Sequence, residues 1–415
     1  MISRRALVVT LAVISFLAAC SSSEEGVAPA STSTVSLPVS STAVSTTDVS
    51  STTAISTTVP VTVTPTTVRP VQEPLPNPEL FDAAIRLHTL DAGSRDVSVA
   101  VVYDGQVIHS YAASSRKSSR AVDEQTSFRI ASISKILTAV TVLKLVEQGQ
   151  LELDEPIVGR VADNIGLMLA DSRARDISVK QLLAHTSGIS NFLEIFFDIG
   201  AYDQMSMLSE ILGQSLSTEP GSAYKYSNVN YVLLGKAIEL VTGLSYHDAV
   251  EQLVLAPLGL QSFRLVGTYE FGPSDALHAV SGGRTYMEQL GAAGAWVATA
   301  IDVAKMVDSI NADSPTLHIL NADLMKLMKA PATPKPVTPI WDYGLGLRLF
   351  VSGEWGHSGS IENVHSMAVH RPDGLVVAVL VNGSKPKETD DLIGAINDAV
   401  LAARTGVVAT TTVAP

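Results

Sequence analysis

Residues 128–135 read Phe128-Arg129-Ile130-Ala131-Ser132-Ile133-Ser134-Lys135, and an apolar helical pattern continues from Ile133 to Gln148. If Ser132 begins this helix, Lys135 lies one turn further along on the same face, where its amine can approach the hydroxyl. A serine is a weak nucleophile without a neighbouring base, and a lysine can be that base only if its pKa is lowered. The spacing therefore predicts Ser132 as a nucleophile with Lys135 beside it. Taken alone, the same pattern also describes a serine N-cap followed by a solvated lysine.

A second motif, Pro220-Gly221-Ser222-Ala223-Tyr224-Lys225-Tyr226-Ser227-Asn228, directly precedes a helical pattern over residues 229–241. A Pro-Gly turn followed by aromatic residues can project Tyr226 and Asn228 from a loop towards a cleft. Tyr226 could relay a proton if nearby cations favoured its phenolate form. The alternative is that Ser227 or Asn228 caps the helix and that Tyr226 is a packing residue.

A third motif, Trp355-Gly356-His357-Ser358-Gly359-Ser360, suits the edge of a sheet. Its small residues allow a substrate backbone to lie along an exposed strand edge, and His357 and Ser358 supply donors for a carboxylate. The alternative is a glycine-rich turn with an incidental histidine.

Strand patterns cluster at the two ends of the folded part of the chain. A helical pattern at 80–90 is followed by strands at 97–102 and 107–112 around the hairpin signal Asp104-Gly105, and further strands at 347–351, 366–370 and 375–381 precede a helix at 390–403. The middle of the chain, from Ile133 to about Met306, has mostly helical patterns. We therefore predict an α/β (α+β) fold in which both chain ends form one antiparallel sheet, flanked by the terminal helices, with a mostly helical inserted lobe. A cleft between the two parts is the expected binding site.

The N-terminal segment has the features of an export signal. Arg4 and Arg5 precede an apolar run over residues 6–19 that is too short to span a bilayer comfortably. The run ends at Leu17-Ala18-Ala19-Cys20, which resembles the lipobox of bacterial lipoproteins, so residues 1–20 are predicted to be a lipoprotein signal peptide with Cys20 as the lipidated residue. An ordinary signal peptide with an incidental cysteine is the alternative. The expected location is the bacterial cell surface or the periplasmic side of the membrane, with membrane contact only through the lipid anchor.

Composition divides the rest of the chain. Residues 21–75 are rich in Ser, Thr, Val and Pro and are predicted to be a disordered linker, as are residues 406–415 at the C-terminus. Residues 76–405 are then the folded domain.

The formal net charge of −13 argues against a nucleic-acid partner. The nine histidines show no His-Glu-x-x-His or other close metal-ligand spacing, so no metal or organic cofactor is expected.

Together, the three motifs resemble the signatures Ser-x-x-Lys, Tyr-x-Asn and Lys/His-Thr/Ser-Gly of the class C β-lactamase and D-alanyl-D-alanine carboxypeptidase superfamily, in the same order. The segments 179–189, 294–304 and 343–346 also look like this family, and the resemblance covers essentially the whole folded part. It implies a β-lactamase/transpeptidase-like fold. It also implies that His185, in the segment 179–189, belongs to a structural loop.

The resemblance assigns roles to individual positions. Ser132 is the acylated nucleophile, Lys135 and Tyr226 transfer protons, and the backbone amides of Ser132 and Ser360 form the oxyanion hole. The implied substrate-binding residues are Asn228, His357, Ser358, Gly359 and Ser360. His357 stands where β-lactamases of this class carry lysine, which argues against efficient deacylation of penicillins.

The expected reaction is attack by Ser132 on a carbonyl, followed by hydrolysis or transfer of the acyl group. A D-alanyl-D-alanine carboxypeptidase-like enzyme or D-amino-acid peptidase is the leading hypothesis, with a small peptide, ester or β-lactam as substrate. An esterase or β-lactamase of the same fold is the first alternative. A non-catalytic lipoprotein that binds cell-wall peptides and a purely structural surface lipoprotein are the others.

Overall fold

The structure is a computed structural model that describes residues 73–190, 203–315, 317–383 and 391–408. The predicted signal peptide with Cys20, the predicted linker up to residue 72 and the tail from residue 409 lie outside the described residues. The described helices and strands run from Pro78 to Thr405.

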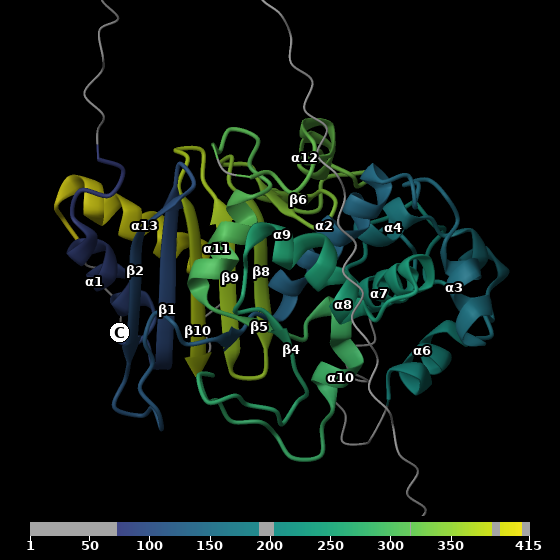
Figure 1. Cartoon of the computed structure of the whole chain (residues 1–415), viewed down its shortest axis with the longest axis horizontal. Helices are drawn as coiled ribbons and strands as arrows, with labels where there is room; N and C mark the ends of the chain where they lie inside the picture. The colour runs from purple at the N-terminus through teal and green to yellow at the C-terminus, as the bar shows by residue number, and fades with distance from the viewer. Residues whose placement is uncertain (1–72, 191–202, 316, 384–390, 409–415) are drawn as a thin grey trace, which may run out of the picture. The chain divides into compact units, whose positions relative to one another are not determined.

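An antiparallel sheet of seven strands, in the order β2-β1-β10-β9-β8-β7-β6, forms the body of the fold (Figure 1). The first and last strands of the chain lie side by side in this sheet, where Val97 of β1 pairs with Val381 of β10. The prediction that both chain ends build one sheet is therefore confirmed. The strands are β1 (Ser94–Tyr103), β2 (Gln106–Ser114), β6 (Trp341–Tyr343), β7 (Arg348–Phe350), β8 (Trp355–Ile361), β9 (Val364–His370) and β10 (Val376–Gly383).

Both faces of the sheet are covered, which explains why β10 is apolar at every position from 376 to 381. Alternate residues point to opposite faces of a strand. Val377, Val379 and Val381 pack under the terminal helices α1 (Pro78–His88) and α13 (Asp391–Thr405). Ala378 and Leu380 belong to the core of the other face, against which α11 (Ala300–Asp308) packs. Helix α11 thus covers the sheet, although it begins within the part of the chain, up to about Met306, that was predicted to form the helical lobe.

The helical lobe surrounds α2 (Ser134–Glu147), whose side chains are buried on nearly every side. The predicted helices at 133–148 and 229–241 are confirmed as α2 and α7. A small sheet in the order β3-β5-β4 leads into α2, and its strands are β3 (Phe128–Arg129), β4 (Arg264–Leu265) and β5 (Trp296–Ala298). The other helical elements are η1 (Ala131–Ile133), α3 (Val158–Ile165), η2 (Ser172–Asp176), α4 (Val179–Leu183), α6 (Gln204–Leu212), α7 (Asn228–Thr242), α8 (Tyr246–Val250), η3 (Glu251–Leu255), α9 (Ala256–Leu258), α10 (Tyr286–Leu290), η4 (Gly291–Ala293) and α12 (Ala322–Met328).

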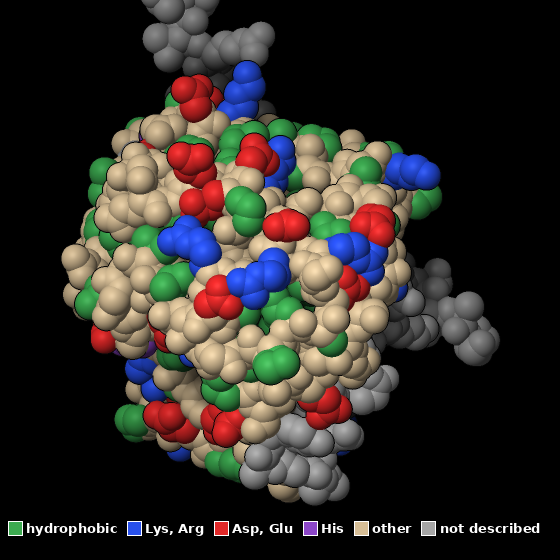
Figure 2. Space-filling model, turned by 90° about the vertical axis from the view of Figure 1, so that its right-hand side faces the viewer, with side chains coloured by type: hydrophobic (Ala, Val, Ile, Leu, Met, Phe, Trp, Pro, Cys, Tyr) green, Lys and Arg blue, Asp and Glu red, His purple; other side chains and the backbone are tan. Residues whose placement is uncertain are grey.

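The face of the helical lobe seen in Figure 2 mixes basic and acidic side chains at close spacing. Ion pairs of the helical lobe include Arg175 with Asp163 at 2.5 Å and Arg160 with Glu155 at 3.2 Å. Exposed pairs of this kind contribute little to stability. The face seen in Figure 2 has no basic patch of the kind that binds a phosphate backbone, because acidic side chains lie among the basic ones.

Candidate active site

Ser132 lies in the short 3₁₀ helix η1, directly after β3. The α-helix begins two residues later, at Ser134, so the expectation that Ser132 itself starts that helix is corrected by two residues. Ala131 has a φ of 47°, a left-handed conformation that is uncommon for a residue with a Cβ atom and often occurs at functional sites. Ala131 and Ile133 are buried, whereas Ser132 is partly exposed. The turn therefore leaves the Ser132 side chain accessible to a substrate, while the residues on either side of it are buried.

Neighbouring strands hold this turn in place. The Ile130 N–H donates to the Trp296 carbonyl at 3.0 Å, and the Ile130 carbonyl accepts a hydrogen bond from Ser366 Oγ at 2.9 Å. On the β8 side, a Cβ atom at Gly359 would lie 2.5 Å from the Ile130 carbonyl oxygen, closer than atoms pack. Glycine at 359 therefore allows β8 to lie directly against the nucleophile turn.

Lys135 is completely buried at the start of α2. Its Nζ lies 3.1 Å from Ser132 Oγ, 2.9 Å from Asn228 Oδ1 and 2.7 Å from the Ala293 carbonyl oxygen. Burial, and then the positive charge of Arg348, lower the pKa of Lys135 well below its usual value. A neutral amine has two N–H groups and one lone pair. The two N–H groups match the amide and carbonyl oxygens, and the lone pair is left for the serine hydroxyl.

Tyr226 approaches the nucleophile from the other side. Its hydroxyl donates to Ser132 Oγ at 2.8 Å, and Lys135 Nζ lies 5.0 Å from the centre of its ring. Burial raises the pKa of Tyr226 to about 12, and the hydrogen bond with Ser132 and the charge of Arg348 offset this only in part. The phenol is thus protonated at neutral pH. The phenolate considered from the sequence is not favoured, and Tyr226 is placed as a proton donor.

The third motif forms β8, which is not the outermost strand of the sheet. β7 lies beyond it but pairs only with Trp355 and Gly356. Among the described strands, residues 357–361 pair with β9 alone. After Gly356 this edge of β8 is therefore unpaired within the described part of the chain, but residues 357–359 are buried along it and Ser360 is exposed.

The His357 side chain is turned into the protein. Its Nδ1 lies 2.5 Å from the Ser358 carbonyl, which can only accept, so Nδ1 carries the proton and Nε2 accepts from the Tyr343 hydroxyl at 2.9 Å. Burial, together with the charges of Arg348 and Lys135, lowers the pKa of His357 well below its usual value. Both ring nitrogens of His357 thus have protein partners, and a contact of His357 with a substrate carboxylate stays a prediction.

The other residues of the third motif differ in accessibility. Ser358 and Gly359 are buried, whereas Ser360 is exposed and its Oγ lies 3.2 Å from His365 Nδ1. Asn228 is buried as the first residue of α7 and holds Lys135 rather than projecting from a loop tip. Lys135 and Tyr226 thus contact the serine directly, and Asn228 contacts Lys135.

His185 was expected to belong to a structural loop, but its contacts with the second motif were not predicted from the sequence. It is fully buried, has a φ of 56°, and its Nδ1 accepts from the Ser227 N–H at 3.2 Å and from Asn230 Nδ2 at 3.1 Å. Its ring centre lies 4.4 Å from that of Tyr226 and 5.0 Å from that of Tyr343. His185 thus packs against the loop of the second motif, and it also contacts Tyr343, whose hydroxyl donates to His357. The repeated aromatic residues near 224–231 were the one available signal for such a cluster.

Replacing His185 with alanine should reduce the rate of Ser132 acylation by about tenfold, because Tyr226 and the Ser227 backbone lose their support. It should also lower the free energy of unfolding by about 2–4 kcal/mol, as expected for a large-to-small change in a core. Acylation kinetics and thermal unfolding measure the two effects separately. The matched control is His109→Ala, which removes a histidine that contacts Phe81 and Asp82 and should reduce stability alone. Equal acylation rates in the two variants would show that His185 has no effect on the acylation of Ser132.

Within the described residues, no group of three or more His, Cys, Asp or Glu side chains is placed to hold a metal ion. In the same part of the chain, no helix is both long and apolar enough to cross a membrane.

Comparison with known proteins identifies the family. The model of the beta-lactamase family matches residues 81–401, which is most of the chain. The chain belongs to the beta-lactamase family. As a member of this family, with esterase and amidase relatives, it is a serine hydrolase of the β-lactamase and penicillin-binding protein superfamily.

Two curated relatives are similar in sequence to this beta-lactamase family member. It is 27% identical to esterase EstB of Burkholderia gladioli over 374 residues, which cover 78% of this chain and 94% of the esterase. It is 32% identical to penicillin-binding protein 4 of Amycolatopsis lactamdurans over 188 residues, which cover 44% of this chain and 46% of that protein.

Solved structures of the family share the fold. The D-amino acid amidase from Ochrobactrum anthropi SV3 aligns with a TM-score of 0.64 and 24% identity, over 78% of this chain and 99% of the amidase. The penicillin-binding protein homologue from Pyrococcus abyssi aligns with a TM-score of 0.64 and 24% identity, over 79% of this chain and 77% of that chain.

Proposed function

We propose that this family member is an exported serine hydrolase that forms an acyl-enzyme on Ser132 and acts as a D-alanyl-D-alanine carboxypeptidase-like enzyme or D-amino-acid peptidase. One observation carries the proposal. Ser132 Oγ lies 3.1 Å from the Lys135 amine and 2.8 Å from the Tyr226 hydroxyl, so a base and a proton donor both contact the nucleophile.

In this mechanism the neutral Lys135 accepts the Ser132 proton as Oγ attacks the substrate carbonyl. The N–H groups of Ser132 and Ser360 stabilise the oxyanion, which the close packing of β8 on the nucleophile turn supports. Tyr226 then donates its proton to the leaving nitrogen and recovers one from Lys135, and the bond between the acyl carbon and the leaving nitrogen breaks. Water then attacks the carbonyl of the Ser132 ester and gives a proton to the pair of Lys135 and Tyr226. The pair returns a proton to Ser132 Oγ as the bond between Oγ and the acyl carbon breaks, which releases the acid product and restores the serine.

The free edge of β8 after Gly356 supports a peptide substrate. An extended peptide can add to such an edge through main-chain hydrogen bonds. The exposed Ser360 hydroxyl can contribute a hydrogen bond to a terminal carboxylate.

An esterase is the second candidate, and the orientation of His357 favours it. With Nδ1 and Nε2 engaged by Ser358 and Tyr343, His357 offers no ring donor to a substrate carboxylate. Esterase EstB is also similar to this chain over 94% of its own length. Simple esters need no such carboxylate contact.

The deciding experiment is intact-protein mass spectrometry of the chain incubated with penicillin G and, separately, with a D-Ala-D-Ala peptide. A lasting penicillin adduct on Ser132 together with release of D-alanine would support the peptidase. Absence of both, with turnover of a p-nitrophenyl ester, would replace it with the esterase.

Export and lipid anchoring rest on Arg4, Arg5, the apolar run and Cys20. Replacing Cys20 with serine should move the protein from the membrane fraction of its host to the soluble fraction, because one residue carries the acyl chains. Fractionation followed by immunoblotting measures this. Retention of the variant in the membrane fraction would contradict the lipid anchor.

A further inference from the structure

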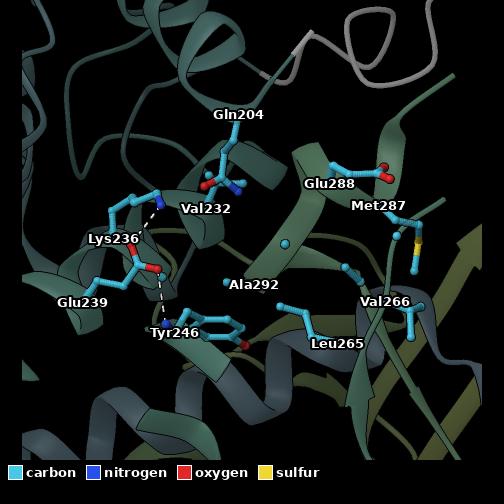
Figure 3. A pocket seen from close by; sticks show the side chains of 14 residues that line it. Gln204, Val232, Lys236, Glu239, Tyr246, Leu265, Val266, Met287, Glu288 and Ala292 are labelled. Atoms are coloured by element: carbon cyan, nitrogen blue, oxygen red, sulfur yellow. Dashed lines mark hydrogen bonds and ion pairs between the residues drawn. The ribbon is translucent and has the colours of Figure 1, made fainter. Parts of the chain in front are cut away.

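A pocket of about 370 Å³ lies outside the catalytic site (Figure 3). None of the groups around the nucleophile lines it. The short helix η4 stands between the two places: Ala292 contributes to the pocket wall, and the carbonyl of the next residue, Ala293, faces Lys135. The pocket is therefore a separate concave site, and its volume falls in the range of small-molecule sites.

One wall of this pocket is an ion pair on α7. Lys236 Nζ lies 2.8 Å from Glu239 Oε2, and Glu239 Oε1 accepts a hydrogen bond from the Tyr246 N–H at 3.2 Å. The two side chains are only 22% and 32% exposed, so the pair is less screened than one on the open surface. An ammonium has three donors and a carboxylate about four acceptor positions, so both groups keep capacity for a ligand.

The facing wall is mostly apolar, and the one carboxylate drawn on it, that of Glu288, already accepts hydrogen bonds from the Thr268 N–H at 2.9 Å and the Thr268 hydroxyl at 2.5 Å. Leu265, Val266 and Met287 lie across the pocket from Lys236 and Glu239 in Figure 3. The floor between the walls includes the Tyr246 ring and Ala292. The lining therefore suits a ligand that carries both signs of charge at one end and an apolar group at the other.

We propose that this pocket binds a small zwitterion with an apolar side chain, such as a free apolar amino acid. Its carboxylate pairs with Lys236, its ammonium pairs with Glu239, and its side chain packs on Leu265, Val266 and Met287. The proposal concerns binding alone and does not depend on which bond the enzyme hydrolyses.

Calorimetric titration of the full-length protein with D-phenylalanine and L-phenylalanine tests the proposal. At least one enantiomer should bind, and its affinity should fall about tenfold in Lys236→Met and in Glu239→Gln, as expected for loss of a charged hydrogen bond. The matched control is Lys326→Met, which removes the same charge from the exposed surface of α12, outside the pocket lining. It should bind like the unaltered chain.

Two ligands test the need for both charges. 2-Phenylethylammonium and 3-phenylpropionate each carry the same ring with one charged group, and both should bind about tenfold more weakly than phenylalanine. Binding of either with the affinity of phenylalanine, no binding of either enantiomer, or unchanged affinity in both pocket variants would overturn the proposal. Because no turnover is measured, failure here is distinct from failure of Ser132 to be acylated.

Discussion

Replacing Ser132 with alanine should reduce covalent labelling by a fluorescent penicillin or a fluorophosphonate by more than about 1,000-fold. Ser132 Oγ is the atom that both the Lys135 amine and the Tyr226 hydroxyl contact, so its loss removes the nucleophile and leaves the rest of the site in place. Gel fluorescence and intact mass spectrometry measure the labelling. The circular dichroism spectrum should be unchanged, because the Ser132 side chain is only partly buried.

Ser134 provides the matched control for this experiment. It lies two residues further along, is fully buried, and its Oγ accepts a hydrogen bond from the Trp296 N–H at 3.4 Å. Ser134→Ala should therefore keep the labelling that Ser132→Ala loses. Undiminished labelling of Ser132→Ala would show that another residue is the nucleophile.

Replacing Lys135 with alanine should slow acylation by at least about 100-fold, because the serine loses the base that accepts its proton. Burial lowers the pKa of Lys135, so its amine becomes neutral and basic at a lower pH than a free lysine does. The acylation rate of the unaltered chain should fall as the pH drops through this lowered pKa and should level off above it. Stopped-flow acylation across a pH series measures both effects, and the variant should lose the pH dependence along with the rate.

The control for Lys135 is Lys144→Ala on the same helix. Lys144 pairs with Glu147 at 2.6 Å near the C-terminal end of α2. Its removal should leave the acylation rate and its pH profile as they are. An acylation rate that is unchanged in Lys135→Ala would exclude this lysine from proton transfer.

The sheet could be predicted from local patterns because its determinants are local. Asp104-Gly105 specifies a hairpin turn by its backbone preferences, and the turn between β1 and β2 is found there. Strand patterns cluster at both ends of the chain, and this clustering predicts that the two ends join in a single sheet. The pairing of Val97 with Val381 follows from that constraint.

Part of the active site could be predicted for the same reason. The spacing of Ser132 and Lys135 places both on one side of a helical turn whatever surrounds them, and the structure puts their side chains 3.1 Å apart. Tyr226 came from a motif far along the chain, so its contact with Ser132 depended on the family resemblance and is found in the structure at 2.8 Å.

The sequence by itself determined which residues can react and in which elements they lie, because turn chemistry and helical spacing act over a few residues. The tertiary structure alone decided their chemical state. Burial lowers the pKa of Lys135 and raises that of Tyr226, and both ring nitrogens of His357 have partners inside the protein. His185 supports the second motif through the Ser227 N–H, 42 residues away along the chain. Desolvation and long-range contacts exist only when distant segments pack together, so no local pattern could specify them.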